Sequence, residues 1–210
     1  MNDWLRWLFF AGPVRLLVLL VLGLNVRHRE RLPAQGPAII VANHNSHLDT
    51  LTLISLMPLS LLPKVRPVAA LDYFMKTKLL AWFATRIIGI LPIDRQGGGN
   101  PLAGPNAALK RGEILVLFPE GSRGEPETLT EFKRGVALLV KENPDVPVIP
   151  VFMHGLGKSL PKGTWVIVPF ICDIFIGERV AWPGSTKRFM NDLRQAIDGL
   201  AAEGHFPPWE

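Results

Sequence analysis

The stretch Val41–Thr50 reads VANHNSHLDT and places His44 five residues before Asp49. On a continuous α-helix these positions would differ by about 140° around the axis, so their side chains could not share a face. They can converge only if the segment is a turn. A histidine that is hydrogen-bonded to a carboxylate is held in one tautomer and becomes a better general base. His44 and Asp49 are therefore candidate catalytic residues that activate a hydroxyl group for attack on a carbonyl.

The residues on either side of this stretch predict a strand, a loop and a helix. Ala38–Ala42 is a short apolar run that follows Gly36-Pro37, which is typical of a buried strand. Leu51–Leu56 reads as the first turns of an apolar helix, with Ser46 or Asp49 as its N-cap. Loops between strands and helices are where α/β proteins carry their chemistry.

Two other interpretations of these residues remain open. His44 could be a loop histidine with satisfied hydrogen bonds, and Asp49 could serve only as a cap. A metal site is a second alternative, because His44, His47 and Asp49 are near neighbours. Their spacing is not that of helix-borne ligand pairs, and no cysteine or carboxylate cluster is nearby, so no metal is expected.

The composition indicates which kinds of molecule the protein could bind. The chain has 210 residues, of which 48% are hydrophobic, and a net charge of +5, which suits one domain that contacts membranes and anionic molecules. The sequence lacks aromatic RNA-binding motifs and zinc-ligand spacings, so we expect lipid rather than nucleic acid. The single cysteine, Cys172, excludes an intrachain disulfide and fits a reducing compartment.

Residues 1–26 are predominantly apolar and include Trp4 and Trp7. Arg15 falls in the middle, which argues against a clean membrane span, and no small-residue cleavage site follows. We expect a helical membrane-associating segment that lies in, or dips into, one leaflet. The basic run 27–31 favours the cytoplasmic face of the cell membrane. The alternative is a buried core helix.

Residues 27–210 predict one α/β domain built on a single mixed sheet, because strand-like and helix-like segments alternate. Val146–Phe152 contains prolines and is expected near an edge or an end of the sheet, whereas Leu79–Ile88 is expected to be a buried helix. The closing helix is predicted to be amphipathic, because apolar residues recur at helical spacing at Phe189, Leu193, Ile197 and Leu200. Further strands are expected at Val65–Leu71, Ile90–Ile93, Ile114–Phe118 and Trp165–Ile176, further helices at Ala107–Arg111 and Phe132–Lys141, and a loose tail at Gly204–Glu210.

Three more blocks lie in predicted strands or at their ends. Gly89–Arg95 (GILPIDR) ends in Arg95, which could bind a phosphate through two hydrogen bonds or pair with Asp94. Val146–Val151 (VPVIPV) is mainly a core strand that could also line an acyl-chain path.

The third block, Phe118–Gly124 (FPEGSRG), combines an irregular turn with Glu120, Gly121, Ser122 and Arg123, and turn amides can bind anions. Ser122 is not part of a G-x-S-x-G elbow, because position 120 is glutamate.

Together, these four blocks resemble those of the lysophosphatidic acid acyltransferase family of glycerolipid acyltransferases over residues 30 to 180. The resemblance implies the α/β fold of the glycerol-3-phosphate acyltransferases and assigns His44 as general base, with help from Asp49. It assigns Arg95, Glu120, Gly121 and Arg123 to binding the acceptor phosphate and shaping the site. Ser122, in the same block, is a further candidate for substrate binding and stands where threonine is commoner in the family.

The implied reaction is transfer of an acyl group from acyl-ACP or acyl-CoA to a lysophospholipid hydroxyl, without a bound cofactor or an acyl-enzyme. The acceptor could also be another lyso-lipid, such as a lyso-amino-acid lipid, since Arg95 and Arg123 equally suit a carboxylate. Two rivals stay open: a hydrolase that uses Ser46 or Ser122, and a lipid-binding membrane protein without catalysis.

Overall fold

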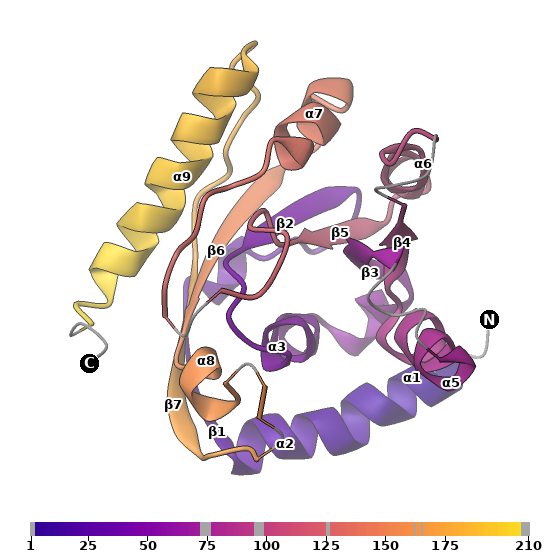
Figure 1. Cartoon of the computed structure of the whole chain (residues 1–210), viewed down its shortest axis with the longest axis vertical. Coiled ribbons are helices and arrows are strands. Elements are labelled where there is room, and N and C mark those ends of the chain that lie inside the picture. Colours follow the sequence, from indigo (N-terminus) through magenta and orange to yellow (C-terminus); the bar gives the residue numbers. More distant parts are fainter. Residues whose placement is uncertain are drawn as a thin grey trace.

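The computed structural model describes residues 3–71, 77–94, 99–124, 127–161, 163–164 and 166–206. Within these residues, seven strands form one sheet in the order β1-β7-β6-β2-β5-β3-β4 (Figure 1). Neighbouring strands are parallel except for the antiparallel pair β6 and β7, so the prediction of a single mixed sheet is confirmed. The strands are β1 (Leu22–Arg27), β2 (Ala38–Ala42), β3 (Val65–Ala70), β4 (Leu91–Ile93), β5 (Ile114–Leu117), β6 (Val148–His154) and β7 (Phe170–Ile176).

Helices cover both faces of the sheet, with α7 and α9 on one side and α1, α2 and α3 on the other (Figure 1). The helices, with short 3-10 or π-helical segments written η, are α1 (Asp3–Phe9), η1 (Phe10–Val14), α2 (Arg15–Leu20), η2 (Arg29–Arg31), α3 (Leu48–Leu56), η3 (Leu59–Lys64), α5 (Lys78–Trp82), η4 (Phe83–Ile88), α6 (Ala103–Lys110), α7 (Gly135–Glu142), α8 (Leu156–Ser159) and α9 (Thr186–Glu203).

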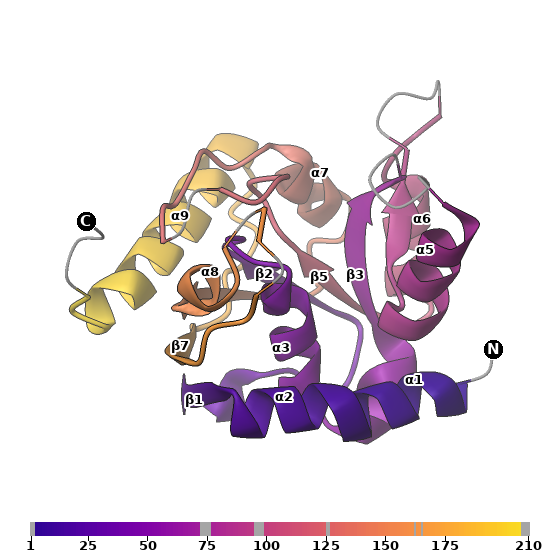
Figure 2. The same cartoon turned by 60° about the horizontal axis from the view of Figure 1, so that its bottom comes forward.

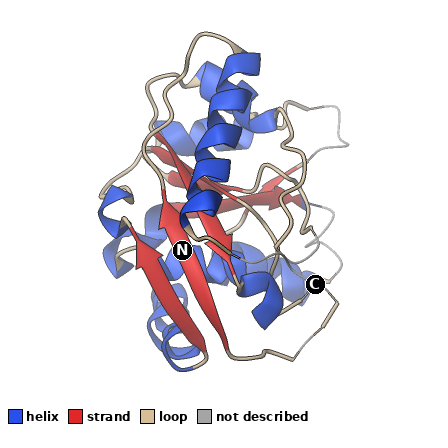
Figure 3. Cartoon of the chain, turned by 90° about the vertical axis from the view of Figure 1, so that its left-hand side faces the viewer, coloured by secondary structure: helices blue, strands red, loops and turns tan. Residues whose placement is uncertain are grey.

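Each face of the sheet has its own hydrophobic core. In β2, Ile39 and Val41 pack on the side of α7 and α9, while Ile40 and Ala42 pack on the side of α3. All five residues of β2 are buried, as expected for a central parallel strand that is covered on both faces. The helix α9 lies against the sheet (Figure 3) and buries Phe189, Leu193, Ile197 and Leu200, which confirms the predicted amphipathic closing helix.

The topology gathers the ends of four strands at one edge. Because β2, β5, β3 and β4 are parallel, their carboxyl ends and the loops that follow them lie on the same side of the sheet. Open α/β sheets bind ligands at that edge. The loop after β2 and the start of α3 carry the predicted catalytic residues His44 and Asp49, and the loop after β5 carries the predicted substrate-binding residues 120–123.

The N-terminal segment forms one long helical run beneath α3 (Figure 2). Phe10, Val14 and Val18 face the core, while Leu19 and Leu20 on the outer side are 67% and 78% exposed. The run leads into β1, which the sequence did not predict and which contains the expected boundary at residue 26. Among the described residues, no helix has both the length and the apolarity needed to cross a bilayer.

Two local expectations were wrong. Strand β6 is central, between β7 and β2, although prolines placed it near an edge. Pro150 fits there because its carbonyl still accepts a hydrogen bond, from the N–H of Gly177, and pairing with β7 starts only at Val151. The segment 79–88 is helical but is not buried on most sides, since Leu79 is 74% exposed.

Candidate active site

The loop between β2 and α3 brings His44 and Asp49 together. His44 Nδ1 lies 2.9 Å from Asp49 Oδ2, and the two side chains are 18% and 1% exposed. The same carboxylate oxygen accepts the backbone N–H groups of Asn45 at 2.7 Å and Ser46 at 2.8 Å. The loop therefore turns around Asp49, which occupies the first turn of α3, and the predicted convergence of the two side chains is confirmed.

This arrangement prepares His44 to act as a base. When Nδ1–H donates to the carboxylate, Nε2 carries the lone pair that can accept a proton. The ring of His44 stacks on Phe118 with a centroid distance of 4.1 Å and an interplanar angle of 20°. The imidazole is thus fixed by a hydrogen bond at its edge and by an aromatic ring on its face.

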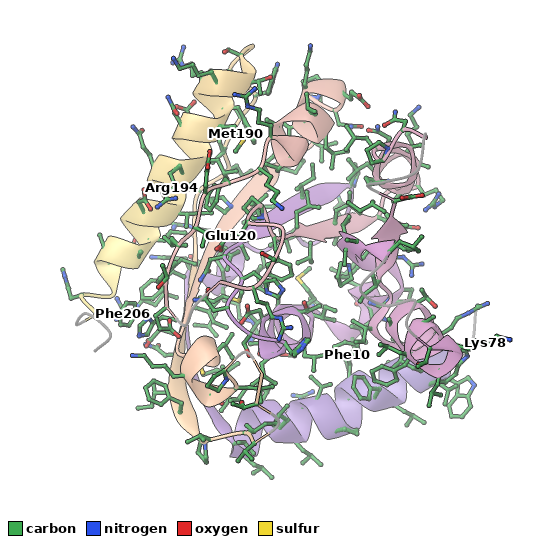
Figure 4. The ribbon with its side chains drawn as sticks, in the orientation of Figure 1. Phe10, Lys78, Glu120, Met190, Arg194 and Phe206 are labelled. Carbon is green, nitrogen blue, oxygen red and sulfur yellow. The ribbon has the colours of Figure 1, made fainter. Side chains whose placement is uncertain are left out.

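The loop after β5 is joined directly to the loop after β2. Glu120, which is 3% exposed, accepts the N–H of His44 at 2.9 Å through Oε1. Its Oε2 accepts the N–H and the hydroxyl of Thr130 at 3.1 and 2.6 Å, and Gly124 N–H donates to the His44 carbonyl. Oε1 of Glu120 therefore joins the two loops, while Oε2 holds a later part of its own loop; Glu120 is labelled in Figure 4.

Gly121 allows a lysine to approach this loop. Its φ of 75° is in the left-handed region, and a Cβ atom at this position would lie 2.7 Å from Nζ of Lys133. The Lys133 N–H also donates to the Pro119 carbonyl at 2.8 Å. Phe118, Gly121 and Lys133 border a cavity of about 100 Å³. Lys133 is a cation that we did not assign to the site from sequence, although it follows Phe132 at the predicted start of a helix.

Arg123 is also close to the histidine loop. Burial lowers the pKa of His47, and the positive charge of Arg123 lowers this pKa further. His47 therefore favours its neutral form. The prediction that Arg123 belongs to this site is consistent with its position, whereas Arg95 lies outside the described residues.

The two serines differ in their surroundings. The Ser46 hydroxyl is fully buried and donates to the Leu160 carbonyl at 2.9 Å, so it is not presented to a substrate. Ser122 is exposed, and among the described residues no hydrogen bond joins it to His44. Neither serine is therefore placed like a nucleophile that is hydrogen-bonded to a general base.

The remaining blocks support the histidine loop or the core. The Asn43 side chain makes two hydrogen bonds with the backbone of Met153 in β6, at 2.8 and 2.7 Å. Val148, Ile149 and Val151 are buried, so the block Val146–Val151 is a core strand.

Cys172 is a buried thiol. Its burial, followed by the charges of Glu127, Asp173 and Asp49, raises its pKa to about 12. Within the described ranges, no three His, Cys, Asp or Glu side chains gather as metal ligands would.

Comparison with known proteins finds similar sequences among acyltransferases. The profile of the Acyltransferase family matches residues 23–154. A chloroplastic 1-acyl-sn-glycerol-3-phosphate acyltransferase of Arabidopsis thaliana is 32% identical over 67% of this chain and 38% of its own length. The enzyme of that name from Bacillus subtilis is 29% identical over 73% of this chain and 75% of its own length. The chain thus spans well under half of the plant relative.

A solved structure supports the fold. The crystal structure of a 1-acyl-sn-glycerophosphate acyltransferase from Thermotoga maritima superposes on this chain with a TM-score of 0.76. The alignment includes 97% of this chain and 80% of the other, and the two sequences are 21% identical over it.

Proposed function

Since this chain belongs to the Acyltransferase family, we propose that it transfers a fatty acyl group from acyl-ACP or acyl-CoA to the free hydroxyl of 1-acylglycerol-3-phosphate, giving phosphatidic acid. The observation that carries the proposal is the 2.9 Å contact between His44 Nδ1 and Asp49 Oδ2 beside the cationic loop. Relatives with matching names support the choice of acceptor.

In the proposed reaction, Nε2 of His44 takes the proton of the acceptor hydroxyl as its oxygen attacks the thioester carbonyl. Asp49 stabilises the imidazolium that forms. The proton then passes to the leaving thiolate, so that the free thiol and the new ester are the products. Arg123 and Lys133 hold the acceptor phosphate near the base, and positioning of this kind can contribute about 7 kcal/mol or more to lowering a barrier. Arg95 is proposed as a third phosphate ligand on the family resemblance alone.

The acyl chain has a candidate binding space on the other side of α3. A cavity of about 510 Å³ lies between α2, β1 and α3, and its lining residues include apolar side chains such as Val18 and Ile54 together with Arg15 and Arg29. Asp49 and Leu56, at the two ends of α3, are roughly 10 Å apart along the helix axis. A chain that extends from His44 along α3 would reach this cavity.

We also propose that the protein contacts the cytoplasmic face of a membrane through one apolar face. This face combines exposed side chains of α1 and α2, of α5, and of residues 166–171. Phe9 of α1 packs edge-on against Phe83 of η4 at 5.4 Å, which places α5 beside the first helix. Leu22 and Gly23, just after α2, pair with Phe170 and Ile171. The apolar face consists of Trp4, Trp7, Leu8, Leu16, Leu19, Leu20, Leu79, Leu80, Trp82, Val166, Val168, Phe170 and Ile171.

The test is incubation of the purified protein with a panel of lyso-lipids, including a lyso-amino-acid lipid, and with each donor. Mass spectrometry then identifies the products. We expect acylation of the phosphate acceptor, and loss of this product in the His44→Ala variant. An active-site serine that is labelled by a fluorophosphonate would instead identify a hydrolase. Activity that survives in His44→Ala would refute the assignment of the base.

A further inference from the structure

A second buried histidine–carboxylate pair lies next to the catalytic loops. His154 Nδ1 is 2.8 Å from Glu127 Oε2, and the side chains are 9% and 5% exposed. The other carboxylate oxygen of Glu127 accepts the N–H of Gly155 at 3.1 Å. Phe206 covers the ring of His154 in a parallel stack with a centroid distance of 3.7 Å. The proposed reaction uses neither residue of this pair.

The backbone of Glu127 has an unusual conformation. Its φ of 60° lies in the left-handed region, which residues other than glycine adopt rarely. Such a conformation persists when the surrounding contacts determine it, and it often marks a functional site. Here the contacts come from three directions, because the carboxylate binds His154 and Gly155 while the main chain reaches the histidine loop.

The contact with the histidine loop is made through Asn45. In the amide orientation that satisfies both groups, the Asn45 oxygen accepts the N–H of Glu127 at 3.0 Å and its NH₂ group donates to the His44 carbonyl at 3.1 Å. Glu127 is thereby linked to both β6 and the residue next to the base. Glu120 provides the corresponding link on the other side of Arg123.

We propose that Glu127 and His154 form a positioning pair that holds the segment carrying Arg123 against the His44 loop. Arg123 lies in the chain between two buried glutamates, and each of them is bonded to the His44 loop or to a neighbouring strand end. Loss of the Glu127 carboxylate contacts would leave this side of the segment held to the His44 loop only through the backbone N–H groups of Gly124 and Glu127, so Arg123 would be held less firmly near the acceptor while His44 and Asp49 keep their contact. The expected change in KM rests on the proposed acyl transfer, whereas the expected changes in proteolysis and hydrogen exchange do not.

Three variants separate the histidine–carboxylate contact from simple packing. Glu127→Ala removes the carboxylate. His154→Phe keeps a ring to stack on Phe206 but removes Nδ1. Glu127→Gln keeps the shape, because its amide oxygen can accept from Gly155 and its NH₂ can donate to the other histidine tautomer. Glu203→Ala is the matched control, since Glu203 pairs with His28 at 3.5 Å on the surface.

The first readout needs no activity. Trypsin cleavage after Arg123, followed by mass spectrometry, should become about tenfold faster in Glu127→Ala, because the variant loses the hydrogen bond from the Gly155 N–H to the carboxylate, and a hydrogen bond to a charged group contributes about this factor. Cleavage should also become faster in His154→Phe, which loses the contact with Glu127. Hydrogen exchange at the Gly155 amide should also accelerate in Glu127→Ala. Glu127→Gln should stay near the wild type, and Glu203→Ala should equal it.

The second readout is kinetic. Both disruptive variants should raise the KM for the phosphate acceptor about tenfold and leave the KM for the thioester unchanged. Wild-type cleavage and exchange rates in variants that melt cooperatively would overturn the proposal, as would an equal rise of both KM values. If the wild type acylates no lyso-lipid, the proposed function fails, but cleavage and exchange still decide whether this pair holds the segment.

Discussion

At the scale of single residues, Asp49 is the group on which the site geometry depends. One of its carboxylate oxygens receives the His44 ring and two backbone N–H groups, so this residue both shapes the loop and orients the base. A carboxamide of the same shape can keep these contacts but carries no charge to stabilise an imidazolium.

We therefore expect Asp49→Asn to lower kcat by on the order of 10²–10⁴-fold, the range typical of general-base catalysis, with a smaller change in KM. Steady-state kinetics measure this effect, and thermal melting shows whether the variant is folded. A folded Asp49→Asn enzyme with wild-type kcat would show that the aspartate only caps the helix.

The cations near Gly121 and His47 give a second prediction. Removing Arg123 or Lys133 should raise the KM for the phosphate acceptor about tenfold, the order expected for one hydrogen bond to a charged group, and should leave the KM for the thioester unchanged. Arg188→Ala is the control, because the Arg188 side chain is 73% exposed on α9. Equal increases for both substrates would contradict the phosphate assignment.

His47 gives a pH prediction. Its pKa is lowered from the usual 6.5 by burial and by Arg123, so the unfolded chain binds a proton more readily than the folded one. This residue's contribution to stability is present above pH 6.5 and is lost as the pH falls toward the folded-state pKa. Denaturant titrations between pH 5 and 8 should show a weaker pH dependence of the unfolding free energy in His47→Gln. An unchanged dependence would show that other groups account for it.

The sequence identified some of these residues and missed others for a physical reason. The contact between His44 and Asp49 was predictable because both lie in one short loop between a strand and a helix. Lys133, Glu127 and His154 were not, because their positions follow from the packing of the segment after β5 against β2 and β6. Arg95 was predicted as a phosphate ligand, and this remains a prediction.

At the scale of elements, periodicity was most informative where one face is buried. The pattern of α9 predicted its four core residues because a helix on one side of a sheet alternates between core and solvent. The segment 79–88 is apolar on most sides, and such a pattern does not distinguish a buried helix from one that faces a non-aqueous surface. The sequence did not predict β1 for a related reason. The apolar residues of the N-terminal helical run continue into this edge strand, so no change of pattern marks where the strand begins.

The core position of Leu193 gives an element-scale prediction. Leu193→Ala should lower the unfolding free energy by about 2–5 kcal/mol, because it removes a fully buried side chain between α9 and the sheet. Gln195→Ala on the exposed side of the same helix should change it by less than about 0.5 kcal/mol. Denaturant melts of both variants measure the difference. Similar values for the two would mean that α9 contributes little to the core.

At the scale of the whole molecule, the apolar face is unusual for the surface of a soluble protein, because it collects many exposed large apolar side chains. It runs along the N-terminal helices and continues onto α5 and residues 166–171, and exposed arginine and lysine side chains such as Arg15 and Lys78 lie beside it. Large contiguous apolar patches mark interaction surfaces, and neighbouring cations favour anionic lipid.

Replacing Leu16, Leu19 and Leu20 together by glutamine should therefore reduce co-sedimentation with vesicles that contain anionic phospholipid. Leu138→Gln is the matched control, because Leu138 is 46% exposed on α7, on the other side of the sheet. Substitution is preferable to deletion of residues 1–26, which would also remove most of β1. Unchanged sedimentation of the triple variant would argue against this surface.

The junction between α2 and β1 bears on the height of the catalytic histidine relative to the bilayer. A single residue, Val21, separates the helix from a strand that is hydrogen-bonded to β7 along its length. The helix therefore cannot pivot independently of the sheet. If the helix rests among lipid headgroups, the height of the imidazole above the bilayer midplane is constant, and acceptors whose hydroxyl sits at another depth would be acylated poorly.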